Sequence, residues 1–432
     1  MNGRESEVQV SVDDETRRTP VSALRHRDFS IYWSGSVVSL VGSQFTTVAM
    51  AWQMYELTNS ALELGLLGLA RGAPMLVLLL FGGLLADAVD RRHLMMATQI
   101  GQMCVSAALA VMTFAGWVTP GVLYTASLFL ALFSALEQPA RTAIIPNLVP
   151  RTDLANALAL SGTQRHLATI IGPSLAGLLL ARSGATFCYA VDAASWIAML
   201  AALVIMRPLG QSAGGRRALS MKALREGVEF VWTHPVILSM MALDFGQNFF
   251  GSGRALLPIY ARDILDVGPQ GLGLLYSATS AGALVMGTAM SIRRQTRRAG
   301  IWVLVSVSAY GIFTAIFGLS QSFWLSFLML AAAGAANTVS FVLRNTINQL
   351  LTPDEIRGRV TSVNSMFTNT GPQLGQFEAG AVASLIGPVG ATAIGGLLVT
   401  SIAAGLTAVR SVRKFEVRES APTATGEVPA RA

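Results

Sequence analysis

Long apolar stretches separated by short polar connections run along most of the chain. A membrane-spanning helix has to cross about 30 Å of hydrocarbon at about 1.5 Å per residue, and runs of that length predict twelve such helices. The first six are expected near 34–57, 61–86, 94–117, 121–138, 160–181 and 185–206, and the last six near 236–260, 271–291, 301–320, 323–343, 362–386 and 389–409. The predicted fold class is therefore all-α integral membrane.

Composition agrees with this pattern. Of the 432 residues, 52% are apolar and only 13% are charged, whereas soluble globular proteins carry about 25% charged residues. Both cysteines, Cys104 and Cys188, lie in apolar runs, where a small hydrophobic role is expected. Soluble, disordered and disulfide-scaffold classes are excluded.

The basic residues predict the orientation. If the N-terminus is cytoplasmic, 27 of the 31 Lys and Arg residues fall in the inner segments, and only Arg182 and Arg262 fall in the outer loops. This bias is the positive-inside rule for a chain with both termini in the cytoplasm. We therefore expect a multi-pass protein of the cytoplasmic (inner) cell membrane, and we interpret the net charge of +7 as a topology signal and not as a nucleic-acid footprint.

The pattern divides the chain into five parts. Within the connection between the two halves, Met221, Leu224 and Val228 follow helical spacing opposite charged residues, which predicts an amphipathic helix on the inner membrane surface. A structural linker is the simpler interpretation of that helix than a regulatory element. The expected parts are a cytoplasmic N-tail (1–30), an N-terminal six-helix bundle (31–206), a cytoplasmic linker (207–235), a C-terminal six-helix bundle (236–410) and a cytoplasmic C-tail (411–432).

The chain repeats itself with a period near 200 residues. Arg141, Leu148-Val149-Pro150 and Gly172-Pro173 in the first half correspond to Arg344, Leu351-Thr352-Pro353 and Gly371-Pro372 in the second. Two six-helix pseudo-repeats around a central cavity are the simplest explanation, and many secondary transporters are built in this way.

Several motifs resemble the major facilitator superfamily. The segment Gly83 to Arg92 is similar to its inner-loop motif, from which it departs at Ala88 and Asp90. Gln138-Pro139-Ala140-Arg141, Ile145 to Pro150 and Asp153 to Ala157 are similar to a bacterial branch that includes enterobactin exporters and macrolide-efflux-like transporters. The resemblance covers nearly the whole chain and implies a transporter that works in efflux.

Two groups of residues gain expected roles from this resemblance. Gly83, Asp87, Asp90, Arg91 and Arg92 would form a gating motif, in which Asp87 meets the positive end of a neighbouring helix when the inner side is closed; loop charges that only set topology are the alternative. The pairs Gly172-Pro173 and Gly371-Pro372 are associated in such exporters with antiport, and ordinary small-residue packing is the alternative.

Nothing in the sequence predicts an enzyme or an ATP-driven pump. The only lysines, Lys222 and Lys414, do not follow glycine, so a phosphate-binding Gly-Lys loop is absent. The four histidines and two cysteines are not clustered, so we expect no metal and no cofactor. Transport energy would then come from an ion or substrate gradient.

Charges inside predicted spans cost several kcal/mol unless they are paired, neutralised or hydrated, and so indicate function. The resemblance implies a peripheral sixth helix, so Asp192 is interpreted as a structural hydrogen-bonding residue. Glu137 is interpreted as the partner of Arg141 one helical turn away. The residues concerned are Arg71, Glu137, Asp192, Asp244, Arg254 and Glu378.

Three of these charges carry specific hypotheses. Arg71 and Glu378 lie roughly 15 and 12 Å below the outer ends of their helices. The resemblance implies that the second and eleventh helices face each other across the two halves, so we expect an ion pair between these residues. Asp244 lies roughly 12 Å deep, with no lysine or histidine at that depth and with Arg254 about 15 Å further along the same helix. It is the candidate for carrying a coupling proton, with a structural hydrogen-bonded acid as the alternative.

Aromatic and amide side chains on four predicted helices are candidates for lining the substrate cavity, and they suit a bulky, partly apolar ligand. For each aromatic residue, lipid or helix packing is the alternative. The candidates are Gln44, Phe45, Trp52, Gln53, Phe133, Asn248, Phe249, Phe250, Asn337 and Phe341.

The sequence therefore predicts a secondary active transporter that exports a small, partly apolar molecule, such as a drug, siderophore or secondary metabolite, by alternating access with proton antiport. The alternatives are a lysophospholipid or lipid flippase of the same fold and a non-transporting membrane sensor or scaffold. The expected partners are a small-molecule substrate, protons and the lipid bilayer, with no nucleic acid, and the expected state is a monomer.

Overall fold

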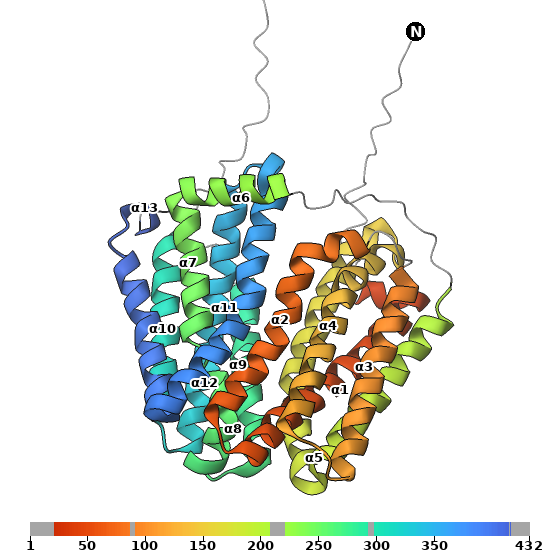
Figure 1. The fold of residues 1–432 in the computed structure, drawn as a ribbon. Helices are drawn as coiled ribbons and strands as arrows, with labels where there is room; N and C mark the ends of the chain where they lie inside the picture. Colours follow the sequence, from red (N-terminus) through yellow and green to blue (C-terminus); the bar gives the residue numbers. More distant parts are fainter. Residues whose placement is uncertain (1–20, 87–90, 208–220, 293–297, 414, 416–432) are drawn as a thin grey trace, which may run out of the picture.

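The apolar runs form long α-helices, because a helix satisfies its backbone hydrogen bonds within one segment, as hydrocarbon requires. A computed structural model describes residues 21–86, 91–207, 221–292, 298–413 and 415 (Figure 1). Nearly all of these residues are helical, and the described part of the chain contains no strand.

The first half of the chain begins with a short 3-10 helix at Ser22–Arg25. It continues with α1 (Arg27–Thr58), α2 (Ala61–Ala86), α3 (Arg91–Phe114), α4 (Pro120–Ile144) and α5 (Leu154–Ile205), with single 3-10 turns at Ile145–Asn147 and Arg151–Asp153.

The second half begins with α6 (Met221–Thr233) and α7 (Pro235–Phe250). A 3-10 helix (Gly253–Leu256), α8 (Leu257–Ile259) and a π-helix (Tyr260–Ile264) follow α7. The remaining helices are α9 (Gly268–Ile292), α10 (Ala299–Leu319), α11 (Phe323–Leu351), α12 (Asp354–Leu406) and α13 (Arg410–Arg413).

Two of these helices, α5 and α12, each contain a sharp reversal. An unbroken helix of 52 residues, the length of α5, would be about 78 Å long. Gly184 in α5 (φ 79°) and Gly387 in α12 (φ 81°) adopt backbone angles that glycine tolerates best. The chain doubles back at these glycines, as Figure 1 shows for α5 at the bottom of the view. The reversals coincide with the predicted boundaries 181–185 and 386–389.

Length and composition identify fewer spans than the sequence pattern predicts. Seven helices of the described residues are long and apolar enough to cross a membrane, or eight if the bent pair Arg225–Thr233 and Pro235–Ile264 is one span. That number counts α5 and α12 as one span each, although each of them reverses direction at a glycine. The protein is a multi-helix membrane protein, and the count of twelve stays a prediction.

The helices form two groups that lie side by side (Figure 1). In the first group α5 packs against α1 and α3, and α4 packs against α2 and α3; in the second, α12 packs against α7 and α10, and α11 packs against α9 and α10. We call these the N group (α1–α5) and the C group (α7–α12). They meet where α2 contacts α12 and where α5 contacts α9.

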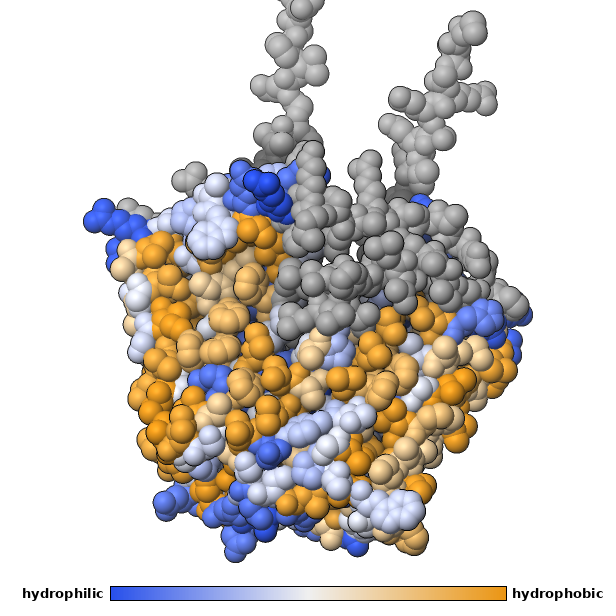
Figure 2. Space-filling model, viewed as in Figure 1, coloured by the Kyte–Doolittle hydropathy of each residue, from blue (hydrophilic) through white to orange (hydrophobic). Residues whose placement is uncertain are grey.

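The two ends of the molecule differ. One end carries tight connections at Asn59–Ser60, Gly184, Asp266–Val267 and Gly387, and we call it the short-loop end. The opposite end, here the terminal end, carries α6 and α13 (Figure 1). Between them the surface is mainly apolar (Figure 2), with side chains such as Val111 and Val285 exposed by 63% and 71%. An apolar belt between polar ends is what a bilayer requires.

The predicted linker helix is present as α6 (Met221–Thr233), which runs across the terminal end (Figure 1). It packs against α12, where Glu226 forms an ion pair with Arg359 and Gly227 lies against the Arg359 backbone. Its placement over the C group fits the structural interpretation of the linker.

Glycines bring the two groups into close backbone contact towards the short-loop end. A Cβ added at Gly177 of α5 would lie 2.9 Å from Cα of Gly273 on α9. A Cβ added at Gly380 of α12 would lie 2.7 Å from Cα of Gly65 on α2. In lipid, a helix gains little from burying apolar surface against another helix, because lipid is equally apolar. Helices therefore associate through close packing, which small residues allow.

Replacing Gly177 or Gly380 with leucine should force the two groups apart at the short-loop end. Overpacking of this kind costs about 1–3 kcal/mol, enough to change a two-state ratio about tenfold. The distance between spin labels at Leu57 and Asp266, in a chain lacking Cys104 and Cys188, should shift to a longer population. Gly162→Leu is the matched control, because no heavy atom lies within 4 Å of a Cβ added at Gly162. Equal distance distributions in all variants would show that the glycine contacts do not hold the two groups together at this end.

Candidate functional site

A polar cavity of about 490 Å³ lies beside the boundary between the two groups. Its walls come from α1–α5 of the N group, and Gln373 of α12 is the one lining residue from the C group. It is lined by Ser43, Thr46, Thr47, Arg71, Gln102, Ser127, Leu130, Ala131, Ser134, Ala135, Gln138, Asp192, Trp196 and Gln373.

The predicted cavity residues of the N group lie elsewhere on the same helices. Phe45 and Trp52 are buried in the apolar core, and the amide of Gln53 accepts a hydrogen bond of 2.8 Å from Tyr189. Gln44 lies against Gly172, and Phe133 lies against the backbone at Gly101. None of these residues lines the 490 Å³ cavity in this structure. Helix packing, the stated alternative, describes their positions.

The predicted residues of the C group lie near one another on α7 and α11. The Phe249 ring packs against Phe250 with centroids 5.0 Å apart. Asn248 donates to the backbone carbonyl of Asp244 (2.9 Å), and Asn337 accepts a hydrogen bond of 2.6 Å from Gln247. Phe341 is 48% exposed. The structure therefore places these residues around a polar cluster.

Asp244 is the centre of that cluster. Its carboxylate forms a buried ion pair of 2.7 Å with Arg344 of α11. It also accepts hydrogen bonds from Asn248 (3.2 Å) and from the Thr368 hydroxyl of α12 (3.0 Å). Arg344 donates in addition to Gln247 (3.3 Å). Three helices of the C group are thus joined through one carboxylate.

The expectation that Asp244 has no cationic partner is wrong, because Arg344 fills that place. The sequence argument considered lysine, histidine and Arg254, and its predicted span 323–343 ended one residue before Arg344. Residue 344 lies within α11, which continues to Leu351.

The N group contains a related cluster. Arg141 forms an ion pair of 2.9 Å with Glu137, as expected. Gln99 and Gln102 of α3 donate to the same carboxylate at 3.2 and 2.8 Å. Arg141 lies near the end of α4, and its predicted repeat counterpart Arg344 lies near the end of α11.

Asp192 is buried without a basic partner. One carboxylate oxygen accepts hydrogen bonds of 2.6 Å from the hydroxyls of Thr46 and Ser106. The other makes no hydrogen bond of standard geometry, although the Trp196 indole lies beside this carboxyl group. No basic group of the described residues lies within 4.0 Å. Since Asp192 also lines the 490 Å³ cavity, it is a carboxyl group that could exchange a proton without breaking an ion pair.

The expected ion pair between Arg71 and Glu378 is not formed in this structure. Both residues are described, and their charged atoms do not approach within 4.0 Å. Arg71 instead donates through Nε to the Ser127 hydroxyl of α4 at 3.2 Å. The contact stripe of α12 that faces α2 runs through Gln373, Gln376 and Gly380, and residue 378 lies off that stripe.

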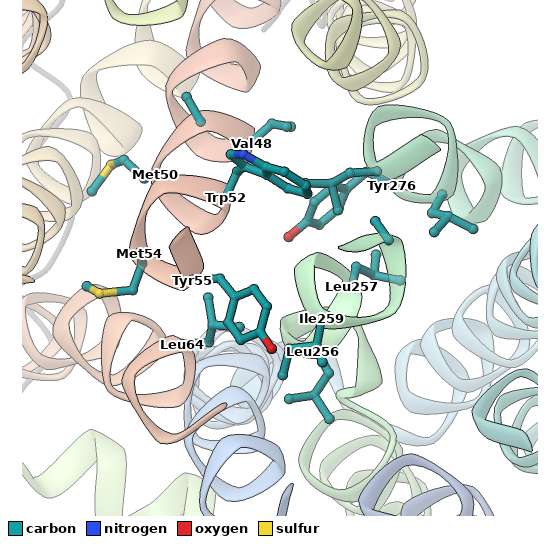
Figure 3. Close-up of a cluster of buried hydrophobic side chains, with 14 of the residues drawn as sticks. Val48, Met50, Trp52, Met54, Tyr55, Leu64, Leu256, Leu257, Ile259 and Tyr276 are labelled. Atoms are coloured by element: carbon teal, nitrogen blue, oxygen red, sulfur yellow. The ribbon is translucent and has the colours of Figure 1, made fainter. Parts of the chain in front are cut away.

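Polar contacts join the groups at the short-loop end. The Tyr55 hydroxyl of α1 donates to Asp263, and Arg262 donates to the Asn59 side chain at 3.0 Å. The Arg262 guanidinium also lies 5.5 Å from the Tyr55 ring centroid. Beside these contacts, Figure 3 shows Trp52 and Tyr55 of α1 directed towards Tyr276 and Leu256, while Met50 and Met54 point to the opposite side of α1. We call the contacts of Tyr55 with Asp263 and of Asn59 with Arg262 the polar latch. It lies next to packed apolar side chains of both groups, and together they join the groups at the short-loop end.

The gating motif lies only partly in the described residues. Asp87 and Asp90 lie outside them. Gly83 belongs to α2, and Arg91 begins α3. Arg92 donates to the backbone carbonyl of Val204 at 3.2 Å.

The two Gly-Pro pairs lie in the first arms of α5 and α12. A Cβ at Gly172 would lie 2.6 Å from Gln44, and one at Gly371 would lie 3.3 Å from Asn248. Pro173 is in α5 and Pro372 is in α12. Each pair therefore packs against the first helix of its own group, α1 or α7.

This arrangement of two helix groups around a boundary with buried charges defines a membrane transporter of the major facilitator type. Solved structures with the same fold include the nucleoside transporter NupG, with a TM-score of 0.70 and 13% identity over 90% of this chain and 100% of that one. They also include a bacterial homolog of the human lysosomal transporter Spinster in an inward-facing, unoccupied conformation, with a TM-score of 0.63 and 14% identity over 90% and 96%.

The family model described as "Transmembrane secretion effector" matches residues 18–430, so the chain belongs to this family of the major facilitator superfamily. The enterobactin exporter EntS of Shigella boydii serotype 18 is 28% identical over 411 residues, which cover 93% of this chain and 95% of that protein. EntS of Escherichia coli O6:K15:H31 is 27% identical over 412 residues, covering 93% and 96%. The chain is a transporter of this family and not an enzyme.

Removing one partner of the Asp244–Arg344 pair should strongly destabilise the protein. Arg344→Gln leaves a buried carboxylate unpaired, at a cost of about 3–5 kcal/mol, and the double variant with Asp244→Asn should recover much of that loss. Unfolding free energies in mixed detergent micelles measure both effects.

The matched control is Arg359→Gln. Its ion pair with Glu226 leaves both side chains more than a third exposed, so the loss should be about 1 kcal/mol or less. Equal losses for Arg344→Gln and Arg359→Gln would show that the buried cluster contributes no special stability.

Proposed function

We propose that this protein exports a small, partly apolar molecule across the bacterial cytoplasmic membrane by alternating access, with both termini in the cytoplasm. The observation that carries the proposal is the location of the contacts between groups. All three hydrogen bonds that join a described residue of one group to a described residue of the other involve Tyr55, Asn59 and Ser174, with Asp263, Arg262 and Ser277 as their partners. They lie towards the short-loop end.

A transporter closed at one end exposes its site to the other. With the short-loop end outside, this is an inward-facing state, in which substrate enters from the cytoplasm. The bias of basic residues towards the terminal end supports this orientation.

Export is supported by the relatives named as enterobactin exporters, which align over nearly their whole length. A drug, a siderophore or another secondary metabolite fits the proposal. The five sequence parts, from the N-tail 1–30 to the C-tail 411–432, serve as its domains, with a monomer as the functional unit. The gating motif and the Gly-Pro pairs would control the movement between the two groups.

The energy source in this proposal is proton antiport. Asp244 can carry the proton only if its pair with Arg344 separates in another state of the cycle. Asp192 can take up a proton without that loss, because no basic group of the described residues lies within 4.0 Å of it. Both carboxyl groups are therefore candidates for coupling, and Asp192 is the stronger one on geometry.

Export is tested by comparing the culture medium of cells with and without the gene, followed by purified protein in liposomes loaded with the compounds that differ. Export of a soluble metabolite supports the proposal. Movement of a lysophospholipid between leaflets in its place would favour the flippase alternative, and no movement of either would favour a sensor or scaffold.

Proton coupling is tested in the same liposomes with an imposed pH gradient. Asp192→Asn should abolish the stimulation of export by the gradient while leaving substrate exchange intact, because an amide cannot exchange the proton. Asp244→Asn is compared directly, and Glu226→Gln, at a partly exposed residue of α6, is the control. Loss of stimulation in Asp244→Asn alone would assign coupling to Asp244, and full stimulation in both aspartate variants would overturn proton coupling through these residues.

A further inference from the structure

Two arginines remain without an acidic partner at the boundary between the groups. Arg71 lies ten residues into α2, and Arg254 lies ten residues before the end of the π-helix, so each is about 15 Å from the short-loop end. No carboxylate of the described residues lies within 4.0 Å of either guanidinium. Unpaired charges at such depth are costly and are typical of substrate or ion pathways.

Arg71 and Arg254 belong to elements that contact each other across the boundary. Arg71 lies on α2, and α2 contacts the 3-10 helix Gly253–Leu256, which carries Arg254. The Arg254 guanidinium carbon lies 5.1 Å from the ring centroid of Tyr276 on α9, a cation–π contact. Two like charges brought together in this way repel each other. One cation from each group therefore lies at this contact between the groups.

The surroundings of the two charges are polar and accessible. Arg71 lines the 490 Å³ cavity together with Ser127 and Gln373. Arg254 is exposed although its neighbours Gly253 and Ala255 are buried, and its guanidinium lies over the ring of Tyr276. Water can hydrate the two charges while no anion is bound, and an anion would neutralise them.

We propose that the transported substrate is an organic anion whose carboxylate, or an equivalent oxyanion, binds between Arg71 and Arg254. This inference rests on the proposed function, whose substrate class it specifies. Guanidinium groups recognise oxyanions through paired hydrogen bonds, which neutral isosteres cannot replace. The Ser127 hydroxyl and the Gln373 amide line the same cavity and can complete the hydrogen bonding of the anion.

The geometry also makes binding depend on the state of the transporter. Because Arg71 belongs to the N group and Arg254 to the C group, an anion between them contacts both moving bodies. Its affinity changes when the groups move relative to each other, and a ligand shifts a conformational equilibrium only by such a difference in affinity.

The test uses three probes of the same size: 1-naphthoate (anionic), 1-naphthamide (neutral) and 1-naphthylmethylammonium (cationic). Their binding to the purified full chain in detergent is measured by equilibrium dialysis. We expect naphthoate to bind about ten- to a hundredfold more tightly than naphthamide, the range that charged hydrogen bonds provide.

Arg71→Gln and Arg254→Gln should each remove most of this preference by weakening naphthoate and leaving naphthamide unchanged. A purely structural role would weaken both probes together. Arg71→Lys and Arg254→Lys keep the charge and should keep part of the preference, which preserves the test if a glutamine variant fails to fold. Arg182→Gln, at an exposed arginine of the short-loop end, is the matched control and should bind as the unmodified chain does.

Equal affinity for naphthoate and naphthamide, tighter binding of the ammonium probe, no binding of any probe, or an unchanged preference in the glutamine variants would each overturn the proposal. The outcome for transport is separate. An intact charge preference without any export in liposomes would leave the anion site standing and overturn the proposed function.

Discussion

A charge inside the hydrocarbon layer has to be paired, neutralised or hydrated, and the buried charges of this protein are sorted by that requirement. Glu137 with Arg141 and Asp244 with Arg344 are paired within a single helix group. These clusters join helices of one group and hold each group as a unit. The unpaired cations lie instead where the two groups face each other. Paired charges therefore hold each group together, whereas the unpaired charges lie at the boundary, where the two groups can move relative to each other.

The boundary itself is held by weak, short-range forces. Helices in lipid associate through close packing and a few hydrogen bonds, since burying apolar surface against another helix gains little over burying it in lipid. The contacts of Gly65 with Gly380 and of Gly177 with Gly273 depend on missing side chains, and the polar latch at Tyr55 and Arg262 reaches water. Such an interface can separate without exposing a hydrophobic core, as alternating access requires.

The sequence predicted the helices well, because apolar length is a one-dimensional property, and it located the reversals at Gly184 and Gly387. It failed where rotation about a helix axis decides the contact. Arg71 and Glu378 have similar depths, yet on α12 the residues facing α2 are 373, 376 and 380. At about 100° per residue, position 378 points well away from that stripe. The partner of Asp244 was missed because it lies 100 residues away, on a helix that continues beyond its apolar run. Part of the lining of the 490 Å³ cavity was missed for the same rotational reason, since Ser43, Thr46 and Ser134 are neighbours of the expected residues Gln44, Phe45 and Phe133.

The two unpaired arginines, combined with the closed short-loop end, suggest how an empty transporter avoids a wasted cycle. Moving from an inward-facing to an outward-facing state requires the terminal end to close over the cavity and most of its water to leave. Without an anion, that step would strip water from Arg71 and Arg254 while they repel each other, and electrostatic repulsion grows as the surrounding dielectric falls. With an oxyanion between them, the same step converts repulsion into two charge-assisted hydrogen bonds, which strengthen as water leaves. Substrate charge would then select the ligand and also permit the conformational change that carries it outward.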